Sequence, residues 1–197
     1  MIGDQGEGRD MAAAFNVLWH DDEHVDRRGR GPGPLQRWLH ALAAELGFSL
    51  ACTGTLEKLS ASLADTDLHW DALIVDMLWA HEPARTFAAL GFELEPLRGL
   101  VAGAQLVGLL RGEVFDADRP KWLRPLRTLP VAVFSSAPAS MGVVSQYVGS
   151  ARHEGVIALV KAVVFHDDVL SIAPEVDQAM RRFLVAADPR RASALTS

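Results

Sequence analysis

The chain has 197 residues, of which 49% are hydrophobic and 22% are charged. These proportions are typical of a folded globular protein, and they exclude wholesale disorder, a collagen-like rod and a coiled coil. The formal net charge of -6 argues against a protein whose main role is to coat nucleic acid, and it leaves room for a cation site.

Compartment and targeting are predicted from the cysteine count and from the first residues. The single cysteine, Cys52, excludes an internal disulfide and a thiolate metal cage, so we expect a cytoplasmic protein. The start of the chain is polar and acidic, which argues against a signal peptide. No uninterrupted apolar run approaches the length of a membrane span, so we expect no transmembrane helix.

Residues 1–13 are rich in Gly and charge, and we expect a disordered N-terminal tail there. A single domain is predicted over residues 14–186, followed by a C-terminal tail at 187–197. The first apolar run, residues 15–19, predicts a buried strand that ends at a charged stretch.

The next elements alternate between helix and strand. Residues 35–46 have apolar side chains at helical spacing, with Gly47 placed to end the helix. Residues 48–52 predict a second strand. Thr55 is placed to cap a second helix over residues 56–63.

Residues 72–75 predict the third strand, and a plausible crossover helix follows much later at 99–111. The whole connection from the third strand to the fourth is far longer than one crossover helix needs. We therefore predict a helical insertion at about residues 80–128. Its parts at 81–96 and 113–127 contain prolines and aromatic residues that suggest an ordered surface elaboration.

The remaining apolar runs, residues 129–134 and 156–160, predict the fourth and fifth strands, with a weakly amphipathic stretch around 143–148 between them. Residues 174–184 predict a final helix. Strands that alternate with helices indicate an α/β protein with a parallel sheet covered on both faces.

Chemically useful side chains follow four of the five predicted strands. Asp21 and Asp22 follow the first, Asp76 the third, Ser135 the fourth and Lys161 the fifth. Ligands collect at the carboxyl ends of parallel strands. Three carboxylates held together repel one another, so the cluster needs a cation, and their hard oxygens select Mg²⁺. An aspartate beside Mg²⁺ and a lysine is a good phosphoryl acceptor.

Each of these residues also has a purely structural interpretation. Asp21 could cap a helix, Asp76 could end a strand in a turn, and Lys161 could be a surface lysine. His20 and His24 flank the acidic residues and suggest a transition-metal site, but we expect His20 simply to face out of the first strand.

Four short motifs together resemble the receiver domains of bacterial two-component response regulators. They are LWHDDE at 18–23, ALIVDM at 72–77, LPVAVFSS at 129–136 and ALVK at 158–161. They occur in the order of that family. The resemblance implies a doubly wound, five-stranded parallel sheet of flavodoxin-like type with strand order 2-1-3-4-5, carrying the insertion as an addition.

The resemblance also implies roles for individual residues. Asp76 matches the phosphorylated aspartate and Lys161 the lysine that pairs with the phosphoryl group. Asp22 matches a direct Mg²⁺ ligand supported by Asp21, so Asp21, Asp22 and Asp76 form the implied metal site. Ser135 matches the hydroxyl that bonds the phosphoryl group.

The sequence departs from the family pattern at several points. Ala162 stands where a proline is usual, and Ala158 stands where the fifth strand usually has an aromatic residue. The long crossover is additional, and we expect no output domain after Leu184. Phosphorylation chemistry is compatible with these changes, but the usual signalling output of the family need not be retained.

The leading hypothesis is a stand-alone receiver that accepts a phosphoryl group on Asp76, with a histidine kinase or phosphotransfer protein as the donor. Its catalysis would at most be self-phosphorylation and self-dephosphorylation. The main alternative is a pseudo-receiver, an interaction module that is not regulated by phosphate. A third hypothesis is a Mg²⁺-dependent phosphotransferase or hydrolase with Asp76 as the nucleophile.

The insertion carries more apolar surface than a crossover needs, and such surface usually marks an interface. We expect it to pack as an ordered cap and to bind a protein partner or a second copy as a homodimer, with Trp122 as an anchor. Its basic residues point to a protein partner more than to nucleic acid in so acidic a chain.

Overall fold

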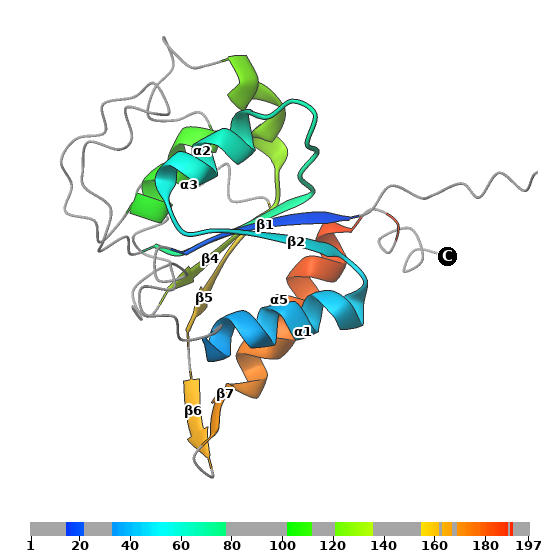
Figure 1. Cartoon of the computed structure of the whole chain (residues 1–197), viewed down its shortest axis with the longest axis vertical. Helices are drawn as coiled ribbons and strands as arrows, with labels where there is room; N and C mark the ends of the chain where they lie inside the picture. Colours follow the sequence, from blue (N-terminus) through cyan, green and yellow to red (C-terminus); the bar gives the residue numbers. More distant parts are fainter. Residues whose placement is uncertain are drawn as a thin grey trace, which may run out of the picture.

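The computed structural model describes most of the predicted domain. It covers residues 15–21, 33–77, 102–111, 121–135, 155–161, 163–166 and 169–188, and residue 190. Five strands form one all-parallel sheet in the order β2-β1-β3-β4-β5 (Figure 1). The strands are β1 (Asn16–His20), β2 (Ser49–Thr53), β3 (Ala72–Val75), β4 (Val131–Ser135) and β5 (Val156–Val160). The predicted α/β flavodoxin-like fold and its strand order are confirmed.

Helices cover both faces of the sheet. Helices α1 (Pro34–Leu46) and α5 (Pro174–Ala187) lie on one face, and α2 (Leu56–Ala64) and α3 (Ala102–Arg111) lie on the other (Figure 1). The central strands β3 and β4 are buried along their whole length, because side chains of both faces enter a core. The sheet is therefore doubly wound, as predicted.

The local signals at the two first helices are confirmed. Gly47 ends α1 with a φ of 67°, in the left-handed region that glycine reaches without strain. The hydroxyl of Thr55 caps α2 by accepting a hydrogen bond from the amide of Lys58. At the other end of the domain, α5 runs to Ala187, one residue beyond the predicted domain boundary.

Helix α3 lies within the predicted insertion at about residues 80–128. Every residue from 103 to 111 is buried, including Gln105 and Arg111. Arg111 donates 2.7 Å hydrogen bonds to the carbonyls of Arg127 and Leu129, which tie α3 to the 3₁₀ helix η4 (Lys121–Thr128). The described part of the predicted segment at 113–127 is thus this 3₁₀ helix, which these bonds join to α3.

Several predictions fall on parts of the chain that are not described. Most of the expected cap, including residues 81–96 and the side chain of Trp122, lies outside the described residues. The same holds for the N-terminal tail, the stretch around 143–148, and most of the C-terminal tail.

An antiparallel hairpin separates the fifth strand from the last helix, and the sequence analysis did not predict it. Strands β6 (Val163–His166) and β7 (Val169–Ile172) pair in a second, small sheet that projects from the α1–α5 side of the domain (Figure 1). The signal was present as two short apolar runs, and only two residues separate the strands that contain them, which is the spacing of a tight hairpin. Among the described residues, no helix has the length and apolar character needed to cross a membrane.

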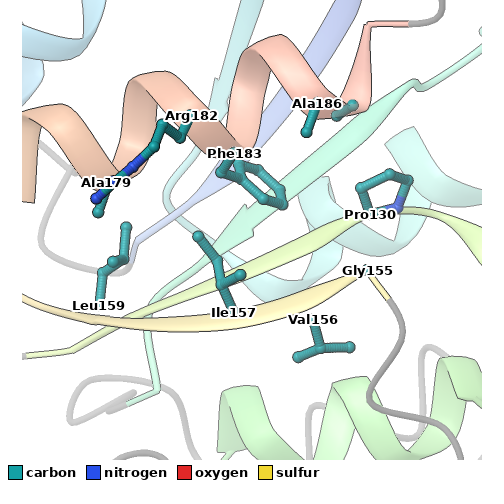
Figure 2. A pocket seen from close by; sticks show the side chains of 10 residues that line it. Pro130, Gly155, Val156, Ile157, Leu159, Ala179, Arg182, Phe183 and Ala186 are labelled. Atoms are coloured by element: carbon teal, nitrogen blue, oxygen red, sulfur yellow. The ribbon is translucent and has the colours of Figure 1, made fainter. Parts of the chain in front are cut away.

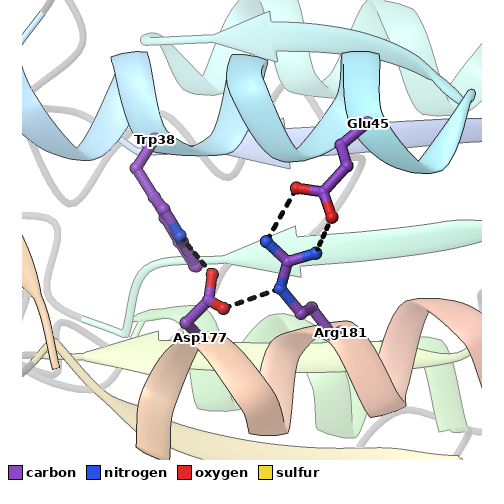
Figure 3. Close-up of polar contacts among 4 residues, drawn as sticks. All are labelled: Trp38, Glu45, Asp177 and Arg181. Carbon is purple, nitrogen blue, oxygen red and sulfur yellow. Dashed lines mark hydrogen bonds and ion pairs between the residues drawn. The ribbon is translucent and has the colours of Figure 1, made fainter. Parts of the chain in front are cut away.

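Four polar side chains clamp α1 to α5 (Figure 3). The indole Nε1 of Trp38 donates to Asp177 Oδ1 at 2.7 Å, and Nε of Arg181 donates to the other oxygen of Asp177 at 2.6 Å. The two terminal nitrogens of Arg181 donate to the carboxylate of Glu45 at 2.6 and 2.9 Å. This bidentate contact fixes the angle between two helices that share one face of the sheet.

The clamp makes part of the stability dependent on pH. Burial opposes ionisation of Asp177, but the hydrogen bonds from Arg181 and Trp38 outweigh burial and lower the pKa of this carboxyl. A lowered folded-state pKa gives stabilisation that is present above the unfolded value of about 3.9 and is lost as the pH falls through the folded value.

We predict that Asp177→Asn lowers the free energy of unfolding by about 1 kcal/mol at neutral pH, because Arg181 loses a partner while Trp38 keeps an acceptor. Urea unfolding at neutral pH and near pH 3 measures this, and the difference from wild type should shrink at the acidic pH. Glu45→Gln is the control. Since the Glu45 side chain is 61% exposed, its loss should be smaller, and equal losses would contradict the prediction.

Candidate functional site

The parallel ladder brings three of the predicted residues to one edge of the sheet. The amide of Asp21 donates to Thr53 O at 3.1 Å, and the amide of Asp76 donates to His20 O at 2.9 Å. These bonds extend the pairing of β1 with β2 and of β3 with β1 by one residue. Each residue therefore emerges directly from the carboxyl end of its strand, where ligands bind in parallel sheets.

The ammonium of Lys161 bridges the two carboxylates. Its Nζ donates to Asp21 Oδ2 at 2.9 Å and to Asp76 Oδ2 at 2.6 Å. The side chains of Lys161, Asp21 and Asp76 are only 10%, 2% and 5% exposed. The expected repulsion between carboxylates is therefore relieved by a cation that the chain itself supplies.

Electrostatics keep Lys161 charged in this buried place. Burial disfavours the ammonium, but ion pairing with Asp21 and then Asp76, together with both hydrogen bonds, outweighs burial and raises the pKa of Lys161. The two carboxylates and one ammonium leave one net negative charge among these three groups.

Ser135 joins this site through its main chain. It is the last residue of β4, it is completely buried, and its carbonyl accepts a 2.7 Å hydrogen bond from the amide of Lys161. Along β4 it continues the alternation of Val131 and Val133, whose side chains pack on the α2–α3 side. The predicted role of its hydroxyl remains a prediction.

Asp22, the predicted direct metal ligand, lies outside the described residues, as do Ser136 and Ala162. The carboxylates of Asp21 and Asp76 both lie within hydrogen-bond distance of one cationic atom, Lys161 Nζ. Carboxylate oxygens are the donors that Mg²⁺ takes from proteins, usually one or two at a time. Among the described residues no group of three His, Cys, Asp or Glu side chains converges on one point. The arrangement fits a cation site with two protein carboxylates.

The expectation that His20 faces out of the first strand is wrong. It is completely buried, and its Nδ1 lies 3.0 Å from Oγ1 of Thr53 on β2. The imidazole therefore ties the ends of two adjacent strands together beside Asp21. A buried polar pair of this kind is a structural feature of the strand end and not a surface metal ligand.

A glycine of the long crossover packs directly on the backbone of Asp76, and the sequence analysis did not single it out. The amide of Gly103, in the first turn of α3, donates to Met77 O at 3.2 Å. A β-carbon at this position would overlap the carbonyl oxygen of Asp76 and would lie 2.9 Å from Met77 Cα. Only glycine allows the helix to approach the end of β3 this closely.

The thiol of Cys52 lies near this strand end but is not suited to nucleophilic chemistry. Burial, and then the nearby charge of Asp21, raise the pKa of Cys52 to about 11. The reactive thiolate is therefore almost absent at neutral pH.

A separate hollow of about 440 Å³ lies between β5 and α5 (Figure 2). Ile157 and Leu159 line it from the strand, and Phe183 and Ala179 from the helix. Its lining is mostly apolar, with Arg182 as the charged exception, and it includes none of the residues of the carboxylate site. The strand-end site and this hollow are thus two separate features of the molecule.

We predict that Lys161→Met lowers the free energy of unfolding by about 3–5 kcal/mol at neutral pH, because two buried carboxylates lose their counter-ion. The wild-type contribution is present below the unfolded lysine pKa of about 10.4 and is lost as the pH rises through the raised folded value. The variant should instead gain stability relative to wild type on mild acidification, which protonates a carboxylate. Denaturant unfolding against pH measures both effects, with exposed Lys58→Met as the control; similar losses in the two variants would contradict the prediction.

We also predict that Gly103→Ala destabilises the fold by about 1–3 kcal/mol, since the added methyl group must displace either α3 or the backbone of Asp76. In an ordinary helix the same change would stabilise by up to about 1 kcal/mol. Gly33→Ala is the matched control, because open space surrounds a β-carbon there. Urea unfolding of both variants decides the matter, and an unchanged or raised stability of Gly103→Ala would show that no tight contact exists.

Comparison with known proteins adds no assignment. No protein-family model matches the chain. No curated protein sequence matches it significantly. The function of the chain therefore has to be inferred from the geometry of the strand-end site.

Proposed function

We propose that this chain is a phosphoacceptor receiver, in which Asp76 accepts a phosphoryl group from a phosphohistidine donor and the modification changes the affinity for a protein partner. One observation carries the proposal: a buried lysine ammonium lies 2.6 Å from the Asp76 carboxylate at the carboxyl edge of a parallel sheet. An acyl phosphate forms where an aspartate is held beside positive charge. The resemblance of the strand-end motifs to receiver domains supports the same proposal.

The transfer is a displacement at phosphorus. An oxygen of the Asp76 carboxylate forms the new P–O bond as the P–N bond to the donor imidazole breaks, and the leaving nitrogen retains the electron pair of that bond. Little covalent chemistry is asked of the protein, so catalysis consists of positioning and charge neutralisation. Lys161 would exchange one carboxylate contact for a phosphoryl oxygen.

The other residues would complete this charge balance. Asp21 and Asp76 would hold Mg²⁺, with Asp22 as the third predicted ligand. When bound, the ion would neutralise the phosphoryl oxygens and supply the positive charge that Lys161 alone does not provide. The hydroxyl of Ser135 would donate a hydrogen bond to a second phosphoryl oxygen.

The pseudo-receiver is the second candidate, and the closure of the site favours it. Lys161 already pairs with both carboxylates, and all three side chains are at most 10% exposed. Such a triad is stable without any phosphoryl group. In a pseudo-receiver its role would be to hold the strand ends together. In that case partner binding would not depend on modification of Asp76.

We predict that the protein incubated with Mg²⁺ and a small phosphodonor gains one phosphoryl group by intact mass, and that Asp76→Asn gains none. Beryllofluoride, which mimics the acyl phosphate, should raise the melting temperature of wild type in a concentration-dependent way, because it binds only the folded state. The matched control is Asp67→Asn, an exposed turn residue that should behave as wild type. If wild type shows neither effect at high donor and beryllofluoride concentrations, the receiver proposal fails and the pseudo-receiver stands.

A further inference from the structure

The ammonium of Lys161 also lies over an aromatic ring that the proposed chemistry does not use. Its Nζ is 5.9 Å from the ring centroid of Phe134, which is completely buried in β4. A cation within about 6 Å of a ring face is attracted by the negative charge of that face. The Phe134 ring therefore contacts the same ammonium that pairs with Asp21 and Asp76.

The position of the Phe134 ring depends on Trp38 of α1. The two ring centroids lie 6.0 Å apart, and the ring planes are inclined at 44°. Phe134 belongs to the core between the sheet and the helices α1 and α5, and the partly buried Trp38 packs against that core. Because protein interiors are close-packed, a reorientation of one ring changes the space available to the other.

The orientation of Trp38 is in turn fixed from the opposite helix. Its indole donates to Asp177 at 2.7 Å, and Arg181 holds the second oxygen of that carboxylate (Figure 3). An indole with an anchored N–H cannot rotate freely about its two side-chain torsions. A continuous chain of contacts thus runs from Asp177 through Trp38 and Phe134 to Lys161.

We infer that Trp38 is a positioning residue for Lys161. Anchored by Asp177, it holds the Phe134 ring beneath the ammonium and so sets where that charge lies relative to Asp76. The structural part of this inference is independent of the proposed function. Its consequence for phosphoryl chemistry rests on that function.

The first test reads the position of Lys161 directly in the unliganded protein. Protons of the lysine ε-methylene group experience the ring current of Phe134, and their NMR signal is assigned by its absence in Lys161→Arg. Trp38→Phe, which removes the anchoring N–H, should shift this signal, and Phe134→Leu should shift it further. If Trp38→Phe leaves the signal unchanged while Phe134→Leu moves it, Trp38 does not position the lysine. An unchanged signal in Phe134→Leu overturns the inference altogether.

The matched control is Trp70→Phe. Trp70 also donates its indole N–H to a carbonyl, that of Ser62 at 2.8 Å, but it packs on the other face of the sheet. It should leave the Lys161 signal in place, and a shift as large as that of Trp38→Phe would show a general effect of losing an indole and overturn the inference. Asp177→Ala provides a second approach should Trp38→Phe fail to fold, since it removes the anchor and keeps the indole.

The second test measures beryllofluoride affinity in the presence of Mg²⁺. Trp38→Phe should weaken it by about two- to five-fold, the effect of a poorly placed cation–ring contact, and Trp70→Phe should not. An unchanged affinity in Trp38→Phe would overturn the functional consequence. If wild type itself does not bind beryllofluoride but the Lys161 signal still moves in Trp38→Phe, the receiver proposal fails while the positioning inference holds.

Discussion

The structure depends on one buried ion cluster, in which the ammonium of Lys161 lies between the carboxylates of Asp21 and Asp76. Removing these charges from water costs several kcal/mol for each ion, which only close pairing offsets. A core of well-packed apolar residues would often be as stable or more so. In the proposed receiver, three charges are retained where parallel strands end because the chemistry at that edge uses them, and perturbed ionisable groups concentrate at such sites.

The cluster is held from three directions, and each uses a different kind of contact. Backbone pairing of the strands fixes where Asp21, Asp76 and Lys161 emerge from the sheet. The close approach of Gly103 fixes the end of β3 from the α3 side. On the opposite face, the Phe134 ring supports the ammonium. Such preorganisation keeps charges in place before any ligand arrives, which is the property that electrostatic catalysis and specific anion binding both require.

The elements with a regular apolar pattern could be predicted from the sequence. The features that depend on a single close contact between distant residues could not. Buried parallel strands read as continuous apolar runs, so the five strands and the convergence of Asp76 with Lys161 could be predicted. The approach of Gly103 to Asp76 and the burial of His20 could not, because each depends on how distant elements dock. The β6–β7 hairpin had a recognisable signal, but no element was predicted between the fifth strand and the final helix.

Charge balance shows how the two candidate functions differ. Before modification, one ammonium faces two carboxylates, and the three groups form a stable unit in a receiver and in a pseudo-receiver alike. Conversion of Asp76 to an acyl phosphate would replace one negative charge by up to two, because a phosphoryl group carries nearly that charge at neutral pH. Lys161 alone could not then balance both the phosphoryl group and Asp21. In a receiver, the modified state would therefore need more positive charge than the unmodified state, so phosphorylation and cation binding would reinforce each other, whereas a pseudo-receiver has no such linkage.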